Sequence, residues 1–394
     1  MTTLKVLFWI CLVLVVYTYV GYGVLLWLLV KMKRIFKGKK STLNMPEDET
    51  LPHVTFLICA YNEQDVVDMK MENTLQLDYP KNKLHIMWVT DGSTDKTNEY
   101  LKRYPRAEVA YSPERRGKTA ALNRGLSLVT SEITVMTDAN TLVNKEALRE
   151  ITAYFQDPKV GCVAGEKRVM ARRENETAAQ GEGLYWRYES ILKQLDSELY
   201  STMGAAGELN AIRTSLYKPM PENALLDDFV MSMRIVDEGY RIAYAPNAYA
   251  MEYGSANLHE ESKRKRRIAA GGLQSSWWLR SMMNPFRNFV VAFQFVSHRV
   301  LRWTITPFAL TALIPLNVLL IFMNAGTVYT LLWVLQVLFY FAAFCGYYLE
   351  QYGKKNKLLY VPYYFLFMNL NVFYGIPYLK SHQHTGTWEK AKRA

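Results

Sequence analysis

Two adjacent carboxylates stand in an apolar stretch of the chain, at Asp227 and Asp228 between Leu226 and Phe229. Burying like charges side by side is costly and raises the pKa of a carboxyl group. An aspartate with a raised pKa suits a general base, which takes a proton from an attacking hydroxyl group. The alternative is structural, with Asp227 as a helix cap and Asp228 in the first turn. Local sequence alone favours the cap.

A basic segment at residues 115–119 precedes a predicted helix. Its Gly-Lys-Thr matches the end of a phosphate-binding loop, but that motif requires glycine at position 112, where the chain has Ser112. Lys118 at a helix start can still bind a diphosphate, because the unpaired N–H groups and the helix dipole favour anions there. A lysine that simply lies in solvent at the helix start is the other interpretation.

Polar residues follow three short apolar runs. Tyr61 and Glu63 come after the first run, Asp91 after the second, and Asp138 and Asn140 after the third. Each cluster alone is as typical of a turn or a helix cap. If the runs are neighbouring parallel strands, however, all three clusters lie at one edge, where such sheets bind ligands.

The elements that must position these side chains alternate along the chain. Runs 54–60, 84–89 and 133–137 predict buried strands, and apolar residues at helical spacing over 64–76 and 117–129 predict helices. Strand and helix in alternation predict an α/β domain with a doubly wound, mostly parallel sheet. The joint placement of the polar clusters then favours a site over three unrelated turns.

Apolar runs without charged side chains flank this domain. Residues 6–30 predict an N-terminal transmembrane helix, since roughly 20 apolar residues suffice to cross a bilayer. A signal peptide has a shorter apolar part, about 7–15 residues. The runs 303–349 and 358–379 predict about three C-terminal membrane segments within 303–379. Pro362, Gly375 and Pro377 favour a broken or re-entrant helix for the last segment.

The net charge of +11 is concentrated beside the apolar runs, at 31–40, 263–267 and 354–357. Lysine and arginine next to a span stay on the cytoplasmic side and attract anionic membrane lipids. We therefore expect a multi-pass protein of the plasma (inner) membrane with a cytoplasmic domain over residues 31–283 and a basic tail at 380–394. Nucleic acid is not an expected partner, because the basic residues do not alternate with stacking aromatic residues.

Residues 284–302 connect the domain to the second apolar run. Apolar residues recur there at helical spacing, which predicts an amphipathic helix along the membrane surface. An ordinary amphipathic helix packed on the domain is the alternative.

Taken together, these motifs resemble the membrane-bound family 2 glycosyltransferases of the GT-A fold, the branch that includes poly-N-acetylglucosamine, hyaluronan and chitooligosaccharide synthases. The resemblance covers residues 54–272, and the matching features are Ala60-Tyr61-Asn62-Glu63, Asp91 to Asp95, Gly117-Lys118 with Ala121-Leu122-Asn123, Asp138-Ala139-Asn140, Gly207 through Arg213, and Asp227-Asp228-Phe229 with Gly239-Tyr240-Arg241. It implies a Rossmann-like GT-A domain joined to α-helical transmembrane segments.

The same resemblance implies an activity and roles for the residues. An inverting transferase would move a sugar, N-acetylglucosamine or another hexose, from a UDP-sugar onto a glycan or lipid-linked acceptor in cell-surface polysaccharide synthesis. Asp228 would be the catalytic base, and Gly207 and Arg213 would bind the acceptor. The nucleotide-sugar donor would be bound by Tyr61, Glu63, Asp91, Lys118, Asp138 and Arg267, and a divalent cation, Mg²⁺ or Mn²⁺, by Asp138 and Asn140.

The chain departs from the family pattern at two places. Asn140 stands where the cation motif usually ends in aspartate, so the cation would depend mainly on Asp138. Of the Gln-x-x-Arg-Trp motif of processive members only Arg267 is kept, and Ile268 lacks the ring that would stack on an acceptor sugar. We therefore expect transfer of one or a few sugars.

Two other functions are compatible with the sequence. A polyprenyl-phosphate glycosyltransferase would use a lipid phosphate as acceptor, and replacing Asp228 would then have only a mild effect. A transporter or a membrane scaffold with a silent domain is the other. A transporter would be expected to carry more spans with ionisable residues inside them, and a scaffold would bind no nucleotide sugar. The sequence does not name the sugar, the acceptor or the linkage.

Overall fold

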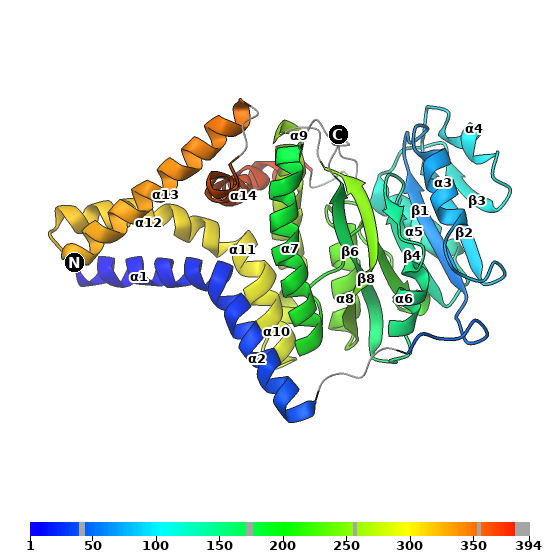
Figure 1. The fold of residues 1–394 in the computed structure, drawn as a ribbon, viewed down its shortest axis with the longest axis horizontal. Helices are drawn as coiled ribbons and strands as arrows, with labels where there is room; N and C mark the ends of the chain where they lie inside the picture. Colours follow the sequence, from blue (N-terminus) through cyan, green and yellow to red (C-terminus); the bar gives the residue numbers. More distant parts are fainter. Residues whose placement is uncertain (39–43, 171–175, 255–257, 353–355, 383–394) are drawn as a thin grey trace.

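The computed structural model describes residues 1–38, 44–170, 176–254, 258–352 and 356–382. A sheet with its covering helices lies at one end of the molecule and long apolar helices lie at the other (Figure 1).

Parts of three predicted basic segments lie outside the described residues. These are Lys39 and Lys40 after the first span, Lys354 and Lys355 before the last segment, and the basic tail from residue 383 on.

The sheet is mixed but mostly parallel, as predicted, with strand order β3-β2-β1-β4-β7-β6-β8-β5. Pairs β1/β2, β1/β4, β2/β3 and β6/β8 are parallel, whereas β7 runs antiparallel to both its neighbours and β5 runs antiparallel to β8. The strands in the described residues are β1 (Val54–Ala60), β2 (Leu84–Asp91), β3 (Ala107–Ser112), β4 (Ile133–Asp138), β5 (Leu142–Val143), β6 (Val160–Met170), β7 (Asn210–Arg213) and β8 (Arg241–Tyr253).

Alternating side chains of the strands pack into two cores, one on each face of the sheet. In β1, Phe56 and Ile58 face one core and Leu57 faces the other, since successive side chains of a strand point to opposite faces. The first core is covered by α3 (Val67–Leu75), α4 (Thr97–Leu101) and α6 (Ala147–Tyr154). The second is covered by α5 (Lys118–Leu128) and α8 (Asp227–Asp237).

Two long helices lie between the sheet and the membrane helices, α7 (Glu176–Leu199) and α9 (Leu258–Trp278) (Figure 1). A helical turn, η3 (Arg280–Met283), follows α9. A short turn, η2 (Thr214–Leu216), follows β7.

Three helices are long and apolar enough to cross a membrane among the described residues. The first covers Thr2–Phe36 and comprises α1 (Thr2–Val16), a π-helical turn η1 (Tyr17–Gly21) and α2 (Tyr22–Lys37). The other two are α12 (Ile305–Phe322) and α13 (Thr327–Gln351).

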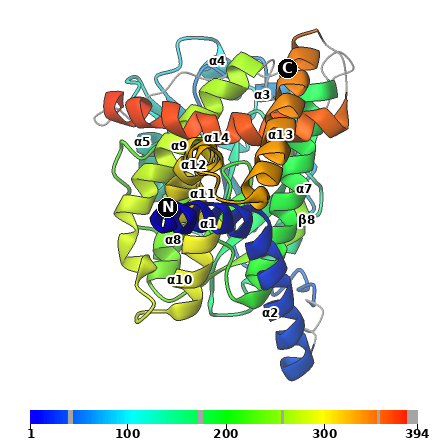
Figure 2. The same cartoon turned by 90° about the vertical axis from the view of Figure 1, so that its left-hand side faces the viewer.

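The first of these helices bends at η1, so that α1 lies along α12 while α2 lies along α7 of the domain (Figures 1 and 2). Tyr22 and Leu26 are buried against Leu192 of α7. Arg34 forms an ion pair with Glu198, with 2.6 Å between Nε and Oε1. The end of the first predicted span is therefore attached to the domain.

The segment predicted as an amphipathic helix, residues 284–302, contains α10 (Phe289–Phe295), the π-helical turn η4 (Val296–Val300) and the start of α11 (Leu301–Trp303). Phe295 is buried in the second core, whereas Phe286 is 97 % exposed. One face of this segment thus packs on the domain, and its contact with a membrane stays a prediction.

The last apolar segment forms α14 (Lys357–Ser381), which lies crosswise to α1 and α12 (Figures 1 and 2). It is one continuous helix, not a broken one, because Pro362 and Pro377 fall near its ends, where they interrupt few intrahelical hydrogen bonds. Gly375 lets α14 approach α9 closely, since a Cβ there would lie 2.8 Å from the Cβ of Ala269. This helix therefore braces α9.

Candidate active site

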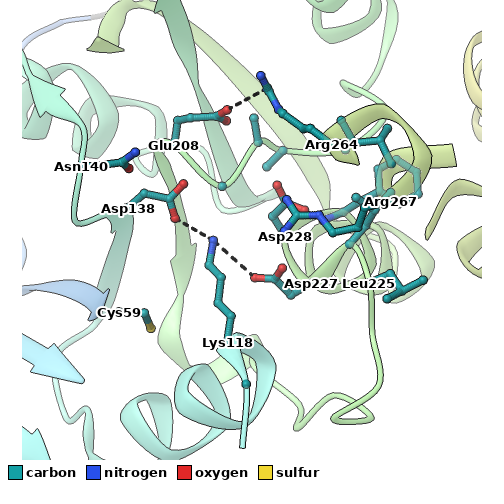
Figure 3. A pocket seen from close by; sticks show the side chains of 18 of the residues that line it. Cys59, Lys118, Asp138, Asn140, Glu208, Leu225, Asp227, Asp228, Arg264 and Arg267 are labelled. Atoms are coloured by element: carbon teal, nitrogen blue, oxygen red, sulfur yellow. Dashed lines mark hydrogen bonds and ion pairs between the residues drawn. The ribbon is translucent and has the colours of Figure 1, made fainter. Parts of the chain in front are cut away.

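A cavity of about 370 Å³ opens where the carboxyl ends of β1, β2 and β4 meet α5, α7, α8 and α9. Figure 3 shows the side chains that face into it. Nearly all predicted site residues line it, namely Tyr61, Glu63, Asp91, Lys118, Asp138, Asn140, Gly207, Asp228 and Arg267.

Asp91, at the end of β2, holds the loop that leads to α5. Its carboxylate accepts hydrogen bonds from the backbone N–H of Arg116 and, at 2.7 Å, of Gly117. Gly92 has a φ of 67°, and a Cβ there would lie 2.6 Å from the backbone nitrogen of Arg115. The tight turn after β2 therefore requires glycine, and it fixes the start of α5 at the cavity.

Two planar side chains stack on each other where they line this side of the cavity. The guanidinium carbon of Arg115 lies 3.9 Å from the centre of the Tyr61 ring, a cation–π contact. Glu63 is held nearby, because its backbone N–H donates to the hydroxyl of Thr97 at 2.8 Å. Planar and polar groups thus lie side by side at the ends of β1 and β2.

Lys118 stands among three carboxylates. Its Nζ lies 2.7 Å from Oδ1 of Asp138 and 3.9 Å from Oδ2 of Asp227 (Figure 3). Burial opposes the charge of Lys118, but Asp138, Asp227 and Asp228 outweigh burial and hold its pKa well above the usual value. The ammonium group of Lys118 thus offsets part of the negative charge of these three carboxylates.

Asp138 and Asn140, at and just after the end of β4, face into the same cavity (Figure 3). No group of three or more acidic, histidine or cysteine side chains with metal-ligand spacing exists among the described residues. One carboxylate and one amide oxygen suit Mg²⁺ or Mn²⁺ when phosphate oxygens complete the ligand set. The two residues therefore fit a cation that arrives with a diphosphate.

Asp228, in the first turn of α8, has the properties of a general base. Burial and the neighbouring charge of Asp227 raise its pKa to about 7, although Lys118 opposes the rise. The backbone N–H of Phe229 donates to Oδ1 at 2.7 Å. A Cβ at Gly207 would lie 3.2 Å from Oδ2, so glycine leaves that oxygen accessible.

The alternative in which Asp227 caps the helix does not describe the structure. Leu226 occupies the cap position, and α8 begins at Asp227. Both carboxylates face the cavity and Lys118, as Figure 3 shows.

Helix α9 contributes basic residues to the wall opposite β4. Burial lowers the pKa of Arg267. Arg264 lies 3.8 Å from Glu208, which Lys167 also contacts at 2.5 Å. Burial works against the charge of Glu208, but the two cations hold its pKa well below the usual value. Glu208 was not predicted as a site residue, although it directly follows Gly207.

Arg213 is not brought to the cavity. Strand β7 is antiparallel to β4, so Arg213 pairs with Ile133 at the opposite end from Asp138. Its guanidinium donates to the backbone carbonyls of Phe155 and Val160, at 2.7 Å and 2.9 Å. The expected contact of Arg213 with an acceptor is therefore not supported, and the residue anchors the loop before β6.

A second group of lining residues was not expected from the sequence. They come from helices on the side of the cavity toward the membrane helices, and no local motif marks them. They are Trp186, Glu189 and Lys193 of α7, Arg299 of η4, Trp303 of α11 and Met368 of α14.

Comparison with known proteins agrees with this geometry. The sequence model described as "Glycosyltransferase like family 2" matches residues 52–271, more than half of the chain. Poly-beta-1,6-N-acetyl-D-glucosamine synthase of Staphylococcus aureus (strain MSSA476) is 28 % identical over 246 residues, which cover 60 % of this chain and 57 % of that protein. The synthase of the same name from Staphylococcus epidermidis is 24 % identical over 272 residues, 66 % of this chain and 64 % of that protein. The chain thus spans less than two thirds of these relatives.

Among solved structures, a mannosyltransferase from Pyrobaculum calidifontis, in complex with GDP-Man and Mn²⁺, superposes with a TM-score of 0.69. The two chains are 22 % identical, and the match covers 95 % of this chain and 99 % of the other. The likeness extends through the helices outside the sheet domain and supports the GT-A fold. On the family match over residues 52–271, the chain belongs to the family 2-like glycosyltransferases.

Proposed function

We propose that this protein is an inverting glycosyltransferase that moves a sugar from a nucleotide diphosphate onto a hydroxyl group of a glycan or lipid-linked acceptor. One observation carries the proposal. A single cavity holds Lys118 against Asp138, where a diphosphate and its cation would bind, together with Asp228, whose pKa of about 7 suits proton removal.

The sheet-side wall is the donor site. Tyr61, Glu63 and Asp91 lie at the strand ends where the nucleotide would bind, and Lys118 would meet the diphosphate at the start of α5. The curated relatives are N-acetylglucosamine polymer synthases, which makes UDP-N-acetylglucosamine the first donor to test. The donor of the mannosyltransferase above is GDP-Man, so a mannosyl donor is the second.

Asp138 and Asn140 would hold a divalent cation, Mg²⁺ or Mn²⁺, on the diphosphate. Such a cation neutralises the negative charge that develops as the nucleotide diphosphate leaves. Lys118 and Arg267 add positive charge from the protein's own residues in the same cavity.

The chemical step is one displacement. Asp228 removes the proton of the acceptor hydroxyl, and the oxygen attacks the anomeric carbon from the face opposite the nucleotide. The bond from that carbon to the phosphate oxygen breaks, and its electron pair leaves with the nucleotide diphosphate. A single attack from the opposite face inverts the configuration.

The protein acts at a membrane. Three crossings by Thr2–Phe36, α12 and α13 would return the chain to the side of the catalytic domain, where α14 also lies. Positive charges at Lys31 and Lys33, near the end of the first span, predict that this side is cytoplasmic. The nucleotide sugar would then be drawn from the cytoplasm.

Transfer of one or a few sugars fits this site better than long-chain synthesis. Ile268 lines the cavity at the position where processive members carry a stacking tryptophan. A lipid phosphate as the attacking group is less well supported. An ionised phosphate has no proton to lose, so the raised pKa of Asp228 would have no role in the reaction.

The experiment is a screen of radiolabelled nucleotide sugars on membranes that contain the protein, with Mn²⁺ or Mg²⁺ added. The wild-type protein is expected to transfer label from one donor into a glycosidic linkage that mild acid leaves intact, and the Asp228→Asn variant is expected to lose this transfer. Acid-labile product that Asp228→Asn still forms would instead indicate the lipid-phosphate acceptor. No consumption of any donor would contradict the proposal.

A further inference from the structure

A buried lysine lies in the cavity wall that faces the membrane helices. Lys193 of α7 is only 3 % exposed, yet it lines the cavity. Among the described residues, its Nζ makes no hydrogen bond and no ion pair within 4 Å, and it lies 5.4 Å from the centre of the Trp186 ring. A buried ammonium group without an anion close by is costly, so an anionic ligand is the natural partner.

A second cation lies close to this lysine. Burial lowers the pKa of Lys193, and the charge of Arg299 lowers it further, although the charges of Glu166, Glu189 and Glu208 oppose the shift without cancelling it. Arg299 contacts Glu189 at 3.1 Å, but Glu189 is shared with Arg302 and with His298 at 3.3 Å. Glu189 is therefore already paired with other cations.

Aromatic rings link this cationic wall to the catalytic carboxylate. The guanidinium carbon of Arg299 lies 5.9 Å from the ring centre of Trp303. The Trp303 ring contacts Phe229 edge-on at 5.1 Å, and Phe229 directly follows Asp228. A sugar ring beside Trp303 would thus present its hydroxyl groups near Asp228 and its anomeric substituent near Arg299 and Lys193.

We infer that Lys193 and Arg299 bind a phosphate group carried by the acceptor, so that the acceptor is a sugar linked to phosphate rather than a neutral glycan. Lysine and arginine are the side chains that proteins use for phosphate. Trp303 lines the same cavity and would supply an aromatic surface for the sugar. The wall lies between the sheet and the long apolar helices, where a lipid-linked phosphate would arrive (Figure 1). This inference rests on the proposed function and specifies its acceptor.

The test measures binding to the full-length protein in lipid nanodiscs, with the donor site filled by UDP and Mn²⁺. Geranyl diphosphate represents a lipid-borne phosphate, and inorganic diphosphate represents a free one. We expect geranyl diphosphate to bind at a second site, and Lys193→Met to weaken this binding by about tenfold or more, whereas Lys193→Arg retains most of it. Tighter binding of geranyl diphosphate than of inorganic diphosphate assigns the phosphate to a lipid, and equal binding assigns it to a soluble sugar phosphate.

Lys118→Met is the matched control, because both lysines are buried in the same cavity. It is expected to weaken binding of UDP with Mn²⁺ while leaving affinity for geranyl diphosphate unchanged, the reverse of Lys193→Met. Unchanged affinity in Lys193→Met, or no second-site binding to the wild type, would overturn the inference. Loss of UDP binding in the wild type would instead count against the proposed donor.

A measurement on the wild-type protein removes any dependence on the folding of a variant. Acetylation of Lys193 by a small amine-reactive reagent, followed by mass spectrometry, is expected to fall when geranyl diphosphate is added in the presence of UDP. Unchanged labelling of Lys193 at saturating geranyl diphosphate would contradict the assignment.

Discussion

Two walls of the cavity are built in different ways. The sheet-side wall contains Asp91, Lys118 and Asp138, and the bundle-side wall, which faces the membrane helices, contains Lys193, Arg299 and Trp303. Asp91 and Asp138 end their strands, and Lys118 begins a helix, so the backbone of the sheet fixes all three. Lys193 and Arg299 come from separate helices that are held together by buried ion pairs to Glu189. The proposed donor site thus rests on the hydrogen-bonded sheet, while the proposed acceptor wall depends on helix packing.

That difference predicts which properties vary independently. Changes on the sheet side should alter donor binding and the chemical step together. Changes on the bundle side should alter the acceptor requirement and leave the donor site intact. The following variants test this division.

The largest effect is expected on the sheet side, from Asp138→Asn. This change removes the carboxylate that contacts Lys118 and that would hold the cation, so kcat/KM for the donor should fall about 100-fold to 1,000-fold. Initial rates at several Mn²⁺ concentrations measure it. Asp48→Asn, at an exposed carboxylate outside the cavity, is the matched control and should behave as wild type. An equal fall in kcat/KM in both variants would contradict the assignment of Asp138 to the donor site.

The pH dependence of the reaction should reveal the pair Asp227 and Asp228. A base must be ionised to act, and burial with the neighbouring charge raises the pKa of Asp228 to about 7, so the rate should rise with pH through about 7. Asp227→Asn removes the like charge and should move this rise to lower pH by about half a unit to one unit. Rate profiles from pH 5 to 9 measure the shift, and a movement to higher pH would contradict the assignment.

A smaller effect is expected on the bundle side, from Trp303→Leu. Loss of the ring contact should raise KM for the acceptor about threefold to tenfold, while KM for the donor is unchanged. Trp277→Leu, at a tryptophan that is 67 % exposed and does not line the cavity, serves as the control. If Trp303→Leu changes KM for donor and acceptor alike, the two walls are not independent.

The smallest kinetic effect is expected for Arg213→Met. The arginine binds backbone carbonyls at the far end of β7, so both KM values should stay within about twofold of wild type. Lost hydrogen bonds should cost about 1–3 kcal/mol of stability, seen as a lower melting temperature. A selective rise in KM for the acceptor would restore Arg213 to the acceptor site.

The same two walls separate what the sequence reveals from what it does not. Asp91 and Asp138 were recognisable because a polar residue after a buried strand has a defined place in a parallel sheet. The fold class followed from the same alternation of strands and helices. Arg213 was misplaced because nothing local shows that β7 runs antiparallel to β4 and carries the residue away from the cavity.

Residues of the bundle-side wall carry no local signal. Lys193 lies in a long helix like any other lysine, and Arg299 looks like one charge of an amphipathic helix. Only the packing of α7 against η4 and α11 buries them and brings them to the cavity. Their position is a property of contacts about a hundred residues apart, such as that of Glu189 with Arg299.

Separate measurement of donor binding and sugar transfer in Asp228→Asn tests the central claim most directly. Binding of the donor with Mn²⁺ should stay near the wild-type affinity, while transfer should fall by about 100-fold or more because the base is lost. Transfer at a rate near that of the wild type would contradict the assignment of Asp228 and, with it, the proposed reaction.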